Sequence, residues 1–515
     1  MSIKLGPVLN FRGCAGGVWR LSALVATDDG AAPEFKLQAG GQPGTVPARQ
    51  IGGFKVGRVD LSLWRYDFLV KQGTAPVTAR YTLDGSTRDI AVPAAGAAPA
   101  IAYGSCNGFS SLKLMKSCKV PNALWEDLAK KHAKAPFHLL LLGGDQLYSD
   151  SMWEEIDVLA KWAALPTEEG VKKPAPEAMK GQLADFFRGL YPKRWSQAAV
   201  AETLATIPTL MMWDDHDIMD GWGSYEKKLH ECDVYGAIFA SAKETFALYQ
   251  QQIGPGESHP LVLPGQQQFT FGCRIGPLAI LALDMRSERT EAQVMGPQSW
   301  KAVYDWLDAL PNAADGGPKH LFIMSSIPVV YPDFSMLEAA LGIFPGRQEL
   351  EDDLKDHWTS VPHRQERLRM IHRLLDFSAK NACRVTLLSG DVHVGAIGTV
   401  RSTRASADDS STRVITQLTS SGIVHPAPPG MVLFFLENVT GKDMSDDRDI
   451  SSEIVEIPGT RNHFIGARNW LALAPDAEHR YWANWHAENE PYPYTKAIHP
   501  ADFAMATAKV KPPEN

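Results

Sequence analysis

The amino-acid sequence predicts a layered α/β protein with a small all-β unit at its N-terminal end. Three observations indicate this fold class. From Ile101 onward, short apolar runs alternate with amphipathic helical stretches. Before residue 95, single apolar and polar residues alternate instead. The Ala/Gly/Pro-rich stretch Pro93–Pro99 separates the two patterns. Because 515 residues are too many for one ordinary core, we expect two units, residues 1–95 and residues 100–515.

The N-terminal unit is predicted to be a β-sandwich of short strands. Within Gly57–Val70, the run Val59–Trp64 has a period of two, which is typical of a half-buried antiparallel strand. Further strands of this kind are expected at Trp19–Ala26, Glu34–Ala39, Thr78–Leu83 and Thr87–Val92. Nothing in this unit resembles a catalytic site.

The second unit is predicted to hold buried strands that are covered on both faces and separated by amphipathic helices. Continuous Leu-rich and β-branched runs indicate such strands, and they occur at His138–Leu142, Thr209–Trp213, Leu278–Leu283, Leu321–Ser325 and Arg384–Leu388. Apolar residues at helical spacing predict helices at Asn122–Lys134 and His363–Lys380. We expect a polar surface loop at Val439–Ser452 and an irregular C-terminal segment, in which the aromatic run Tyr481–Trp485 is strand core rather than a base-stacking platform.

Composition narrows the classes of function. Hydrophobic residues make up 44% of the chain and charged residues 21%, which is typical of a globular protein. The net charge of −8 argues against broad affinity for nucleic acid or anionic membrane, although it leaves room for a local basic pocket. The N-terminal residues show neither a signal peptide nor a twin-arginine pair, no apolar run suggests a membrane span, and the six scattered cysteines suggest reduced thiols. A cytoplasmic location is therefore expected.

Polar residues follow the predicted strands at the points where those strands end. A further strand is expected at Ile101-Ala102-Tyr103. After it and after four of the strands above come Gly104-Ser105-Cys106-Asn107, Gly143-Gly144-Asp145-Gln146-Leu147-Tyr148, Asp214-Asp215-His216-Asp217, Asp284-Met285-Arg286 and Ser389-Gly390-Asp391-Val392-His393. In open α/β sheets, sites assemble beyond the carboxyl ends of strands. Four of these five ends supply residues that can bind a metal.

The types of these residues predict a metal site. Carboxylates and imidazoles bind hard or borderline cations, and a thiolate adds a preference for iron or zinc. If Asp145, Asp215 and Asp391 gather together, cations must neutralise them or some must stay protonated, and we favour cations. Asp391 and His393 lie two residues apart, so in extended backbone both side chains point to one face. The glycines before Asp145 and Asp391 are expected to allow sharp turns and close approach of a ligand.

Five motifs in this order resemble the alkaline phosphatase D (PhoD-like) family of the metallophosphoesterase superfamily. They are Ser-Cys-Asn, Gly-Asp-x-x-Tyr, Trp-Asp-Asp-His-Asp, Leu-Asp-x-Arg and Ser-Gly-Asp-Val-His, between about Ile101 and Pro426. Weaker likenesses occur at Gln298–Trp300, Asp356–Trp358 and Leu418–Ser421. The resemblance implies a β-sandwich core flanked by helices, often preceded by a small immunoglobulin-like or fibronectin-like domain.

The resemblance also implies a set of metal ligands. Cys106, Asp145 and Tyr148 would hold a ferric ion, and Asp145 and Asp391 would bridge or flank a second metal, commonly calcium, with zinc, manganese or magnesium as alternatives. His393 would serve the same centre, as would Asp215. The better-known exported members have Glu after Asp-Asp-His and a nearby Asn, whereas this sequence has Asp217 and then Asp220-Gly221-Trp222-Gly223.

The predicted chemistry is hydrolysis of a phosphomonoester or phosphodiester by a metal-activated water or hydroxide. His216 would stabilise developing charge or protonate the leaving oxygen, Arg286 would hold phosphate oxygens, and Asn107 would donate a further hydrogen bond. The substrate would be a small-molecule phosphoester, and no nucleic acid is expected as a structural partner.

Several of these residues also fit purely structural roles, and the protein could belong to other functional classes. Cys106 and Tyr148 also fit ordinary buried residues, Asp214 fits a helix cap or a partner of the ligands, and Arg286 fits a surface ion pair with Asp284 or Glu288. The histidines at 230, 463 and 486 are expected to be structural, and His357-Trp358 to line the pocket. Rival functions are phospholipase-D-like cleavage of larger diesters, a non-catalytic phosphate-ligand-binding protein, and an iron redox protein.

Overall fold

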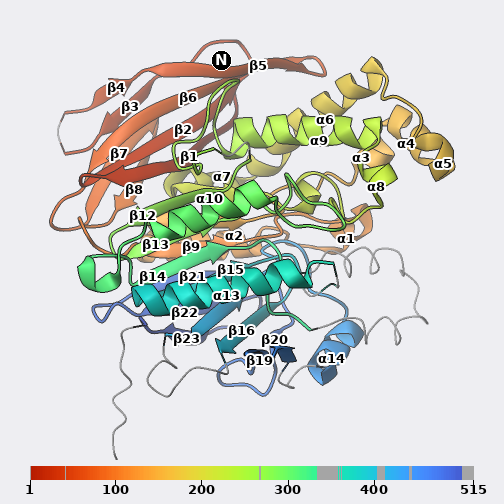
Figure 1. Ribbon diagram of the computed structural model, residues 1–515. Helices are drawn as coiled ribbons and strands as arrows, with labels where there is room; N and C mark the ends of the chain where they lie inside the picture. The colour runs from red at the N-terminus through yellow and green to blue at the C-terminus, as the bar shows by residue number, and fades with distance from the viewer. Residues whose placement is uncertain are drawn as a thin grey trace, which may run out of the picture.

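Three β-sheets with helices around them form the protein (Figure 1). The computed structural model describes residues 2–40, 42–265, 268–332, 358, 360, 362–402, 412–439 and 444–501. One expected feature, the Asp356-His357 pair, lies outside the described residues.

The largest sheet joins the N-terminal strands to the centre of the molecule. Across the sheet its ten strands are β23 (Tyr494–Ile498), β22 (Tyr481–Ala487), β21 (Asn469–Pro475), β9 (Ile101–Gly104), β10 (Leu139–Gly143), β11 (Thr209–Met212), β1 (Ile3–Ala15), β2 (Val18–Thr27), β6 (Val59–Lys71) and β5 (Ala48–Val56). Strands β9, β10 and β11 are parallel, so their carboxyl ends lie at one edge. Strand β1 joins them by parallel pairing of Asn10 with Thr209.

The second sheet has nine strands. They are β12 (Phe271–Ile275), β13 (Leu278–Ala282), β14 (His320–Met324), β15 (Arg384–Ser389), β17 (Val414–Thr419), β16 (Gly395–Ser402), β19 (Ile450–Val455) and β18 (Met444–Asp447) in order, with β20 (Phe464–Ile465) paired to β16. Strands β13, β14, β15 and β17 are parallel to one another. A second group of strand ends therefore lies at one edge of this sheet.

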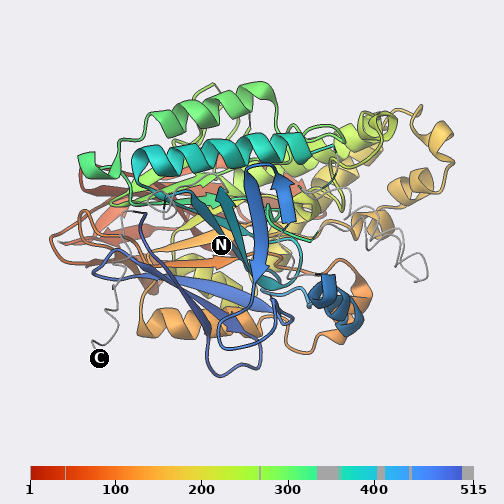
Figure 2. The same cartoon turned by 60° about the horizontal axis from the view of Figure 1, so that its bottom comes forward.

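The two large sheets pack face to face between layers of helices. Tyr103 and Leu141 of the first sheet share one buried apolar cluster with Phe322 and Leu388 of the second. The outer face of the second sheet is covered by α10 (Pro297–Asp308) and α13 (Arg364–Asn381), which lie side by side in Figures 1 and 2. The outer face of the first is covered by α2 (Ala123–Lys134), α6 (Glu177–Trp195) and α7 (Ala198–Thr206). The layers thus run helix, sheet, sheet, helix.

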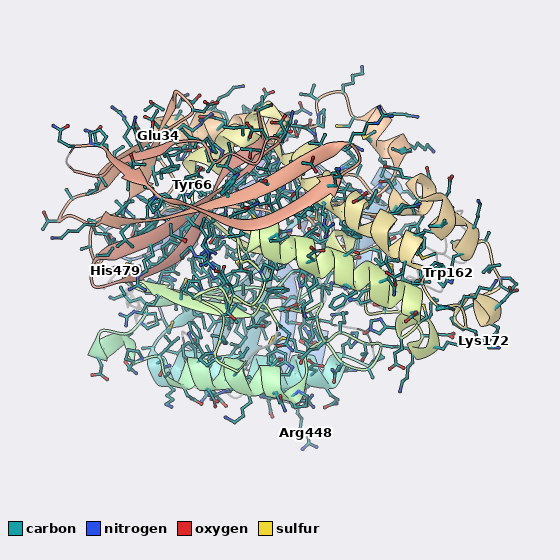
Figure 3. All side chains as sticks on the ribbon, turned by 90° about the horizontal axis from the view of Figure 1, so that it is seen from above. Glu34, Tyr66, Trp162, Lys172, Arg448 and His479 are labelled. Carbon is teal, nitrogen blue, oxygen red and sulfur yellow. The ribbon has the colours of Figure 1, made fainter. Side chains whose placement is uncertain are left out.

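A third, four-stranded sheet packs on the N-terminal part of the ten-stranded sheet. Its strands are β4 (Gly44–Val46), β3 (Phe35–Gln38), β7 (Val77–Leu83) and β8 (Ser86–Val92). Phe35 stacks on Tyr81 within it and on Tyr66 of β6, with ring centroids 5.0 and 5.1 Å apart. Figure 3 shows Tyr66 among these strands. The region before residue 95 is all-β, as predicted, but β1, β2, β5 and β6 continue the central sheet, so the domain boundary stays a prediction.

Short helices extend the molecule at the end opposite these strands, where Figure 3 shows Trp162 and Lys172 far from Glu34. They are α3 (Met152–Glu155), α4 (Asp157–Ala163), α5 (Thr167–Gly170), α8 (Lys227–His230) and α9 (Asp233–Thr245), which continues into a π-helical turn, Phe246–Gln250. Among the described residues, the other helices are α1 (Leu112–Ser117) and α14 (Gly430–Val439), with 3-10 turns at Asp215–Asp217 and Ala313–Asp315. No helix in the described part of the chain has both the length and the apolar character needed to cross a membrane.

The predicted strands and helices form within a few residues of their expected bounds, whereas several other strands were not predicted, among them β1, β4, β5, β12, β16 and β17. Two expectations are wrong. The stretch Val439–Ser452 contains β18 and the start of β19, because its polar residues lie on strands at the edge of the sheet. The C-terminal segment is regular, since β21, β22 and β23 form an antiparallel extension. The run Tyr481–Trp485 is a strand whose Tyr481 and Trp485 are buried, as predicted.

Candidate metal centre

Backbone hydrogen bonds hold together the loops that follow the strands. The N–H of Cys106 donates to the carbonyl of Gly144 at 3.3 Å, and the N–H of Asn107 donates to the carbonyl of Asp145 at 2.7 Å. The N–H of Ser149 likewise donates to the carbonyl of His216 at 3.0 Å. Loops from three separate stretches of the chain are thereby fixed against one another.

Two glycines permit the close approach of these loops. Gly144 has φ +103°, and a Cβ there would lie 2.7 Å from the Cβ of Asp214. A Cβ on Gly390 would lie 2.3 Å from Oγ of Ser105. The glycines before Asp145 and Asp391 therefore admit neighbouring protein loops, and only Gly144 needs a left-handed backbone.

Unusual backbone conformations concentrate at the predicted ligands. Nine described non-glycine residues have positive φ, and four of them are Cys106, Asp145, Asp391 and His393, with φ between 54° and 67°. Side chains rarely tolerate this region, and such residues cluster at functional sites. The expectation of extended backbone from Asp391 to His393 is wrong, because both residues lie in a left-handed turn.

The predicted ligands converge on one place, where Cys106, Asp145 and Asp215 are buried and Asp391 is half-buried. Oxygen and nitrogen atoms of Asp145, Asp215 and His216 lie within 4.8 Å of one another, and so do carboxylate oxygens of Asp214, Asp215 and Asp391. The two groups share Asp215. The thiol of Cys106 lies 3.4 Å from Oδ2 of Asp145. Residues from three strand ends of one sheet and one strand end of the other thus meet in one centre.

Aromatic and imidazole rings close one side of this centre. The hydroxyl of Tyr148 lies 3.3 Å from Nε2 of His393, and its ring stacks on His216 with centroids 4.3 Å apart. The ring of His425 stacks on that of His393, with ring centroids 3.6 Å apart. Ser421 places its hydroxyl 3.1 Å from the sulfur of Cys106. His425 was not among the predicted site residues, although it follows the weakly similar stretch Leu418–Ser421.

The electrostatics of the centre favour a cation. Burial, together with Asp215 and Asp214, raises the pKa of the Asp145 carboxyl well above its usual range. Burial raises the pKa of the Cys106 thiol and of the Tyr148 phenol as well, and nearby acidic groups add to both shifts. Oδ1 of Asp145 is buried and has no hydrogen-bond partner among the described residues. A cation would supply that partner and favour the ionised groups, so this donor set fits a metal.

His216 pairs with the carboxylate of Asp150, which was not among the predicted site residues. Its Nδ1 lies 2.6 Å from Oδ2 of Asp150, and the other oxygen of Asp150 accepts the N–H of Asp220 at 2.8 Å. Burial alone would lower the pKa of His216, but the charges of Asp150 and Asp215 outweigh it and raise the pKa well above its ordinary value. The imidazole is thus oriented and held protonated when the carboxylates are ionised.

Arg286 is fully buried among the acidic residues. Its Nε donates to Asp214 at 2.5 Å, one terminal nitrogen donates to Asp215 at 3.3 Å, and the other donates to the carbonyl of Trp222 at 2.9 Å. The alternative of a surface ion pair is wrong, because none of the side chain reaches solvent. Asp214 occupies the cap position of the 3-10 turn Asp215–Asp217 and pairs with Arg286, which matches its expected role as a partner of the ligands.

Asn107 and Asp217 stabilise the loops around the centre through hydrogen bonds. The side-chain oxygen of Asn107 accepts from Nε1 of Trp125 at 2.8 Å and from Arg194. Asp217 accepts the N–H of Leu147 at 3.1 Å and that of Asp214 at 3.0 Å, and burial raises its pKa to about 7. Asp217 thereby links the loop after β10 to the loop after β11.

The three described histidines that were expected to be structural, His230, His463 and His486, each contact a neighbouring side chain. The imidazole of His463 lies 3.0 Å from Glu437, His486 stacks on Trp470 at 4.4 Å, and His230 packs against Trp222 at 4.7 Å. Trp358 is buried, and its Nε1 donates to Ser325 at 3.4 Å.

The fold and the site together define an α/β protein with a candidate metal centre at the carboxyl ends of its strands. Residues 101–344 and 335–449 match the family described as PhoD related phosphatase. The chain belongs to this family. It is also 27% identical over 505 residues to the uncharacterized protein YGR266W of Saccharomyces cerevisiae, a match that covers 81% of this chain and 71% of the yeast protein.

Proposed function

We propose that the protein is a metal-dependent phosphoester hydrolase whose centre binds a ferric ion and a divalent metal such as calcium. The observation that carries this proposal is the convergence of buried Cys106, Asp145 and Asp215 with half-buried Asp391 in one acidic place. Membership of a phosphatase family supports the reaction class.

Two sets of residues would hold the metals. Cys106, Asp145 and Tyr148 offer thiolate, carboxylate and phenolate, which suit ferric iron. Asp215 and Asp391 offer carboxylates to the second metal, with Asp145 between the two sets, and His393 completes the centre. When bound, the metals would lower the pKa of a coordinated water and polarise the phosphoryl oxygens.

The protein's own side chains would handle the leaving group. His216, oriented by Asp150, is placed beside Asp145 and Asp215, where it can donate a proton to the departing oxygen. Arg286 orients Asp214 and Asp215, so we assign it to positioning the ligands and no longer to direct contact with phosphate. Asn107, whose side-chain oxygen is engaged by Trp125 and Arg194, is assigned to bracing.

Hydrolysis of p-nitrophenyl phosphate and bis(p-nitrophenyl) phosphate tests this function. We expect turnover by the purified protein, loss of turnover after chelation, and recovery with iron together with calcium, zinc, manganese or magnesium. Asp215→Asn should abolish turnover, whereas the exposed control Asp89→Asn should keep it. Turnover that survives both chelation and Asp215→Asn would contradict the proposal.

The same assay separates the rival functions. A preference for the diester would favour cleavage of larger diesters. Phosphate binding without any turnover would favour a non-catalytic phosphate-binding protein. A reversible redox change of bound iron without hydrolysis would favour an iron redox protein.

A further inference from the structure

Helix α14 exposes apolar side chains on its outer face. Met431 is 58% exposed and Phe434 is 65% exposed, while Leu436 on the inner face is 1% exposed and packs in the core. Surface helices normally turn polar residues outward. From residue 422 to residue 436 the chain has no Asp, Glu, Lys or Arg. The outer face of α14 therefore carries two large apolar side chains, with polar but uncharged Asn438 exposed near its end.

Helix α1 and the residues after it form a second exposed segment, which combines apolar and basic side chains. Leu112 is 43% exposed, Met115 is 46% exposed, and no residue of the helix is buried. Lys113, Lys116 and Lys119 are exposed, and the stretch from residue 107 to residue 125 contains no acidic residue. Mixed apolar and lysine side chains on a short exposed helix are typical of segments that lie at a lipid interface.

Both helices begin beside the metal centre. The hydroxyl of Ser110, just before α1, lies 3.2 Å from Nε2 of His425, a few residues before α14. The N–H of His425 donates to the carbonyl of Cys106 at 3.1 Å, and its ring stacks on His393. Figure 1 draws α1 and α14 on the same side of the molecule. The apolar and basic side chains thus lie on segments that lead directly from the centre.

We propose that α1 and α14 form a docking surface for an anionic lipid bilayer, and that the bilayer presents a phosphorylated lipid to the metal centre. This substrate class rests on the proposed function. Charge complementarity supports the choice of a bilayer, because three lysines gather in a segment without acidic residues on a chain of net charge −8. A second copy of the chain, docked by twofold symmetry, would instead bring these lysines toward one another.

Vesicle co-sedimentation tests the docking surface. We expect the protein to sediment with vesicles of equimolar phosphatidylcholine and phosphatidylserine, and far less with phosphatidylcholine alone. The Met431→Ser/Phe434→Ser variant should bind at least about tenfold more weakly. Changing Lys113, Lys116 and Lys119 to Gln should weaken binding by about 100-fold, because each lysine contributes about fivefold near an anionic surface.

A matched control replaces exposed apolar residues elsewhere in the molecule. Leu69→Ser/Tyr492→Ser changes side chains that are 60% and 81% exposed, on β6 and on the turn between β22 and β23, and should leave vesicle binding unchanged. All of these variants should keep the wild-type melting temperature, since the replaced side chains are exposed. Equal vesicle binding by wild type and Met431→Ser/Phe434→Ser, or no binding by wild type, would overturn the proposal.

Activity assays separate this proposal from the proposed function. The docking variants should hydrolyse soluble bis(p-nitrophenyl) phosphate like wild type but lose most hydrolysis of phosphatidic acid or phosphatidylcholine in anionic vesicles. Vesicle binding without hydrolysis of any phosphoester would leave the docking surface standing and reject the hydrolase. A concentration-dependent dimer that is lost in Met431→Ser/Phe434→Ser would assign the surface to a second copy and overturn lipid docking.

Discussion

Arg286→Met is expected to destabilise the fold, because it removes the positive charge between two buried carboxylates. Arg286 has no exposed surface, and its side chain bonds to Asp214 at 2.5 Å and to Asp215 at 3.3 Å. Removing one partner of a buried ion pair costs about 3–5 kcal/mol, because the other charge stays buried without compensation. Methionine fills a similar volume, so the loss would come mainly from charge and hydrogen bonding.

The size of the effect on melting temperature follows from the length of the chain. At about 2.1 cal/mol/K per residue, a chain of 515 residues has an unfolding entropy of about 1.1 kcal/mol/K. A loss of about 4 kcal/mol should then lower Tm by about 4 °C in differential scanning calorimetry of the metal-free protein. Excess divalent cation should shrink the difference, because the cation compensates the carboxylates in place of arginine.

An exposed ion pair supplies the control for this measurement. Arg80 bonds to both oxygens of Asp89, at 2.7 and 2.9 Å, with its side chain 56% exposed. Arg80→Met should therefore lower Tm by no more than about 1 °C. If Arg286→Met shifts Tm as little as Arg80→Met does, Arg286 is not the counter-ion of the buried carboxylates and its positioning role must be abandoned.

Two further predictions concern the imidazoles. Asp150→Asn should lower kcat by about 100-fold with little change in KM or metal content, since His216 loses its orienting carboxylate at 2.6 Å; an unchanged kcat would remove His216 as the proton donor. Burial lowers the pKa of His259 well below 6.5, so the folded protein holds this imidazole neutral. The stability that the neutral imidazole contributes is complete above pH 6.5 and is lost as pH falls below that value, where the unfolded chain takes up a proton. Urea unfolding between pH 7.5 and 5 should therefore show that the wild-type protein loses more stability on acidification than His259→Gln does. The difference should be about 1.4 kcal/mol per pH unit below 6.5. Parallel pH profiles of the two proteins would contradict this assignment.

The convergence of the candidate site could largely be foreseen because its residues follow strands that are recognisable from their own sequences. Asp145 and Asp391 come shortly after apolar runs. Parallel pairing aligns the ends of the strands within each sheet, and the packing of the two sheets brings both groups of ends together. His425 and Asp150 could not be foreseen in this way. Neither follows a buried strand directly, and each gains its role from a contact across the fold, with His393 and with His216.

Burial and sheet pairing were less accessible to sequence reasoning. The position of Arg286 after a strand suggested phosphate contact or a surface ion pair, and only the folded chain brings Asp214 and Asp215 around it. The expected boundary at residue 95 rests on a local change of composition, whereas the central sheet crosses it through the pairing of Asn10 with Thr209. Such long-range pairing leaves no local pattern in the chain.

The metal content of wild type and Asp145→Asn tests the account most directly. Asp145 lies near Asp215, His216 and the thiol of Cys106, and one of its oxygens is buried without a hydrogen-bond partner among the described residues. Elemental analysis should find iron and a second metal in the folded wild-type protein, which should be coloured by thiolate and phenolate ligation. The folded Asp145→Asn protein should lose the metals and the colour together. An Asp145→Asn protein that retains both metals would contradict the proposed centre.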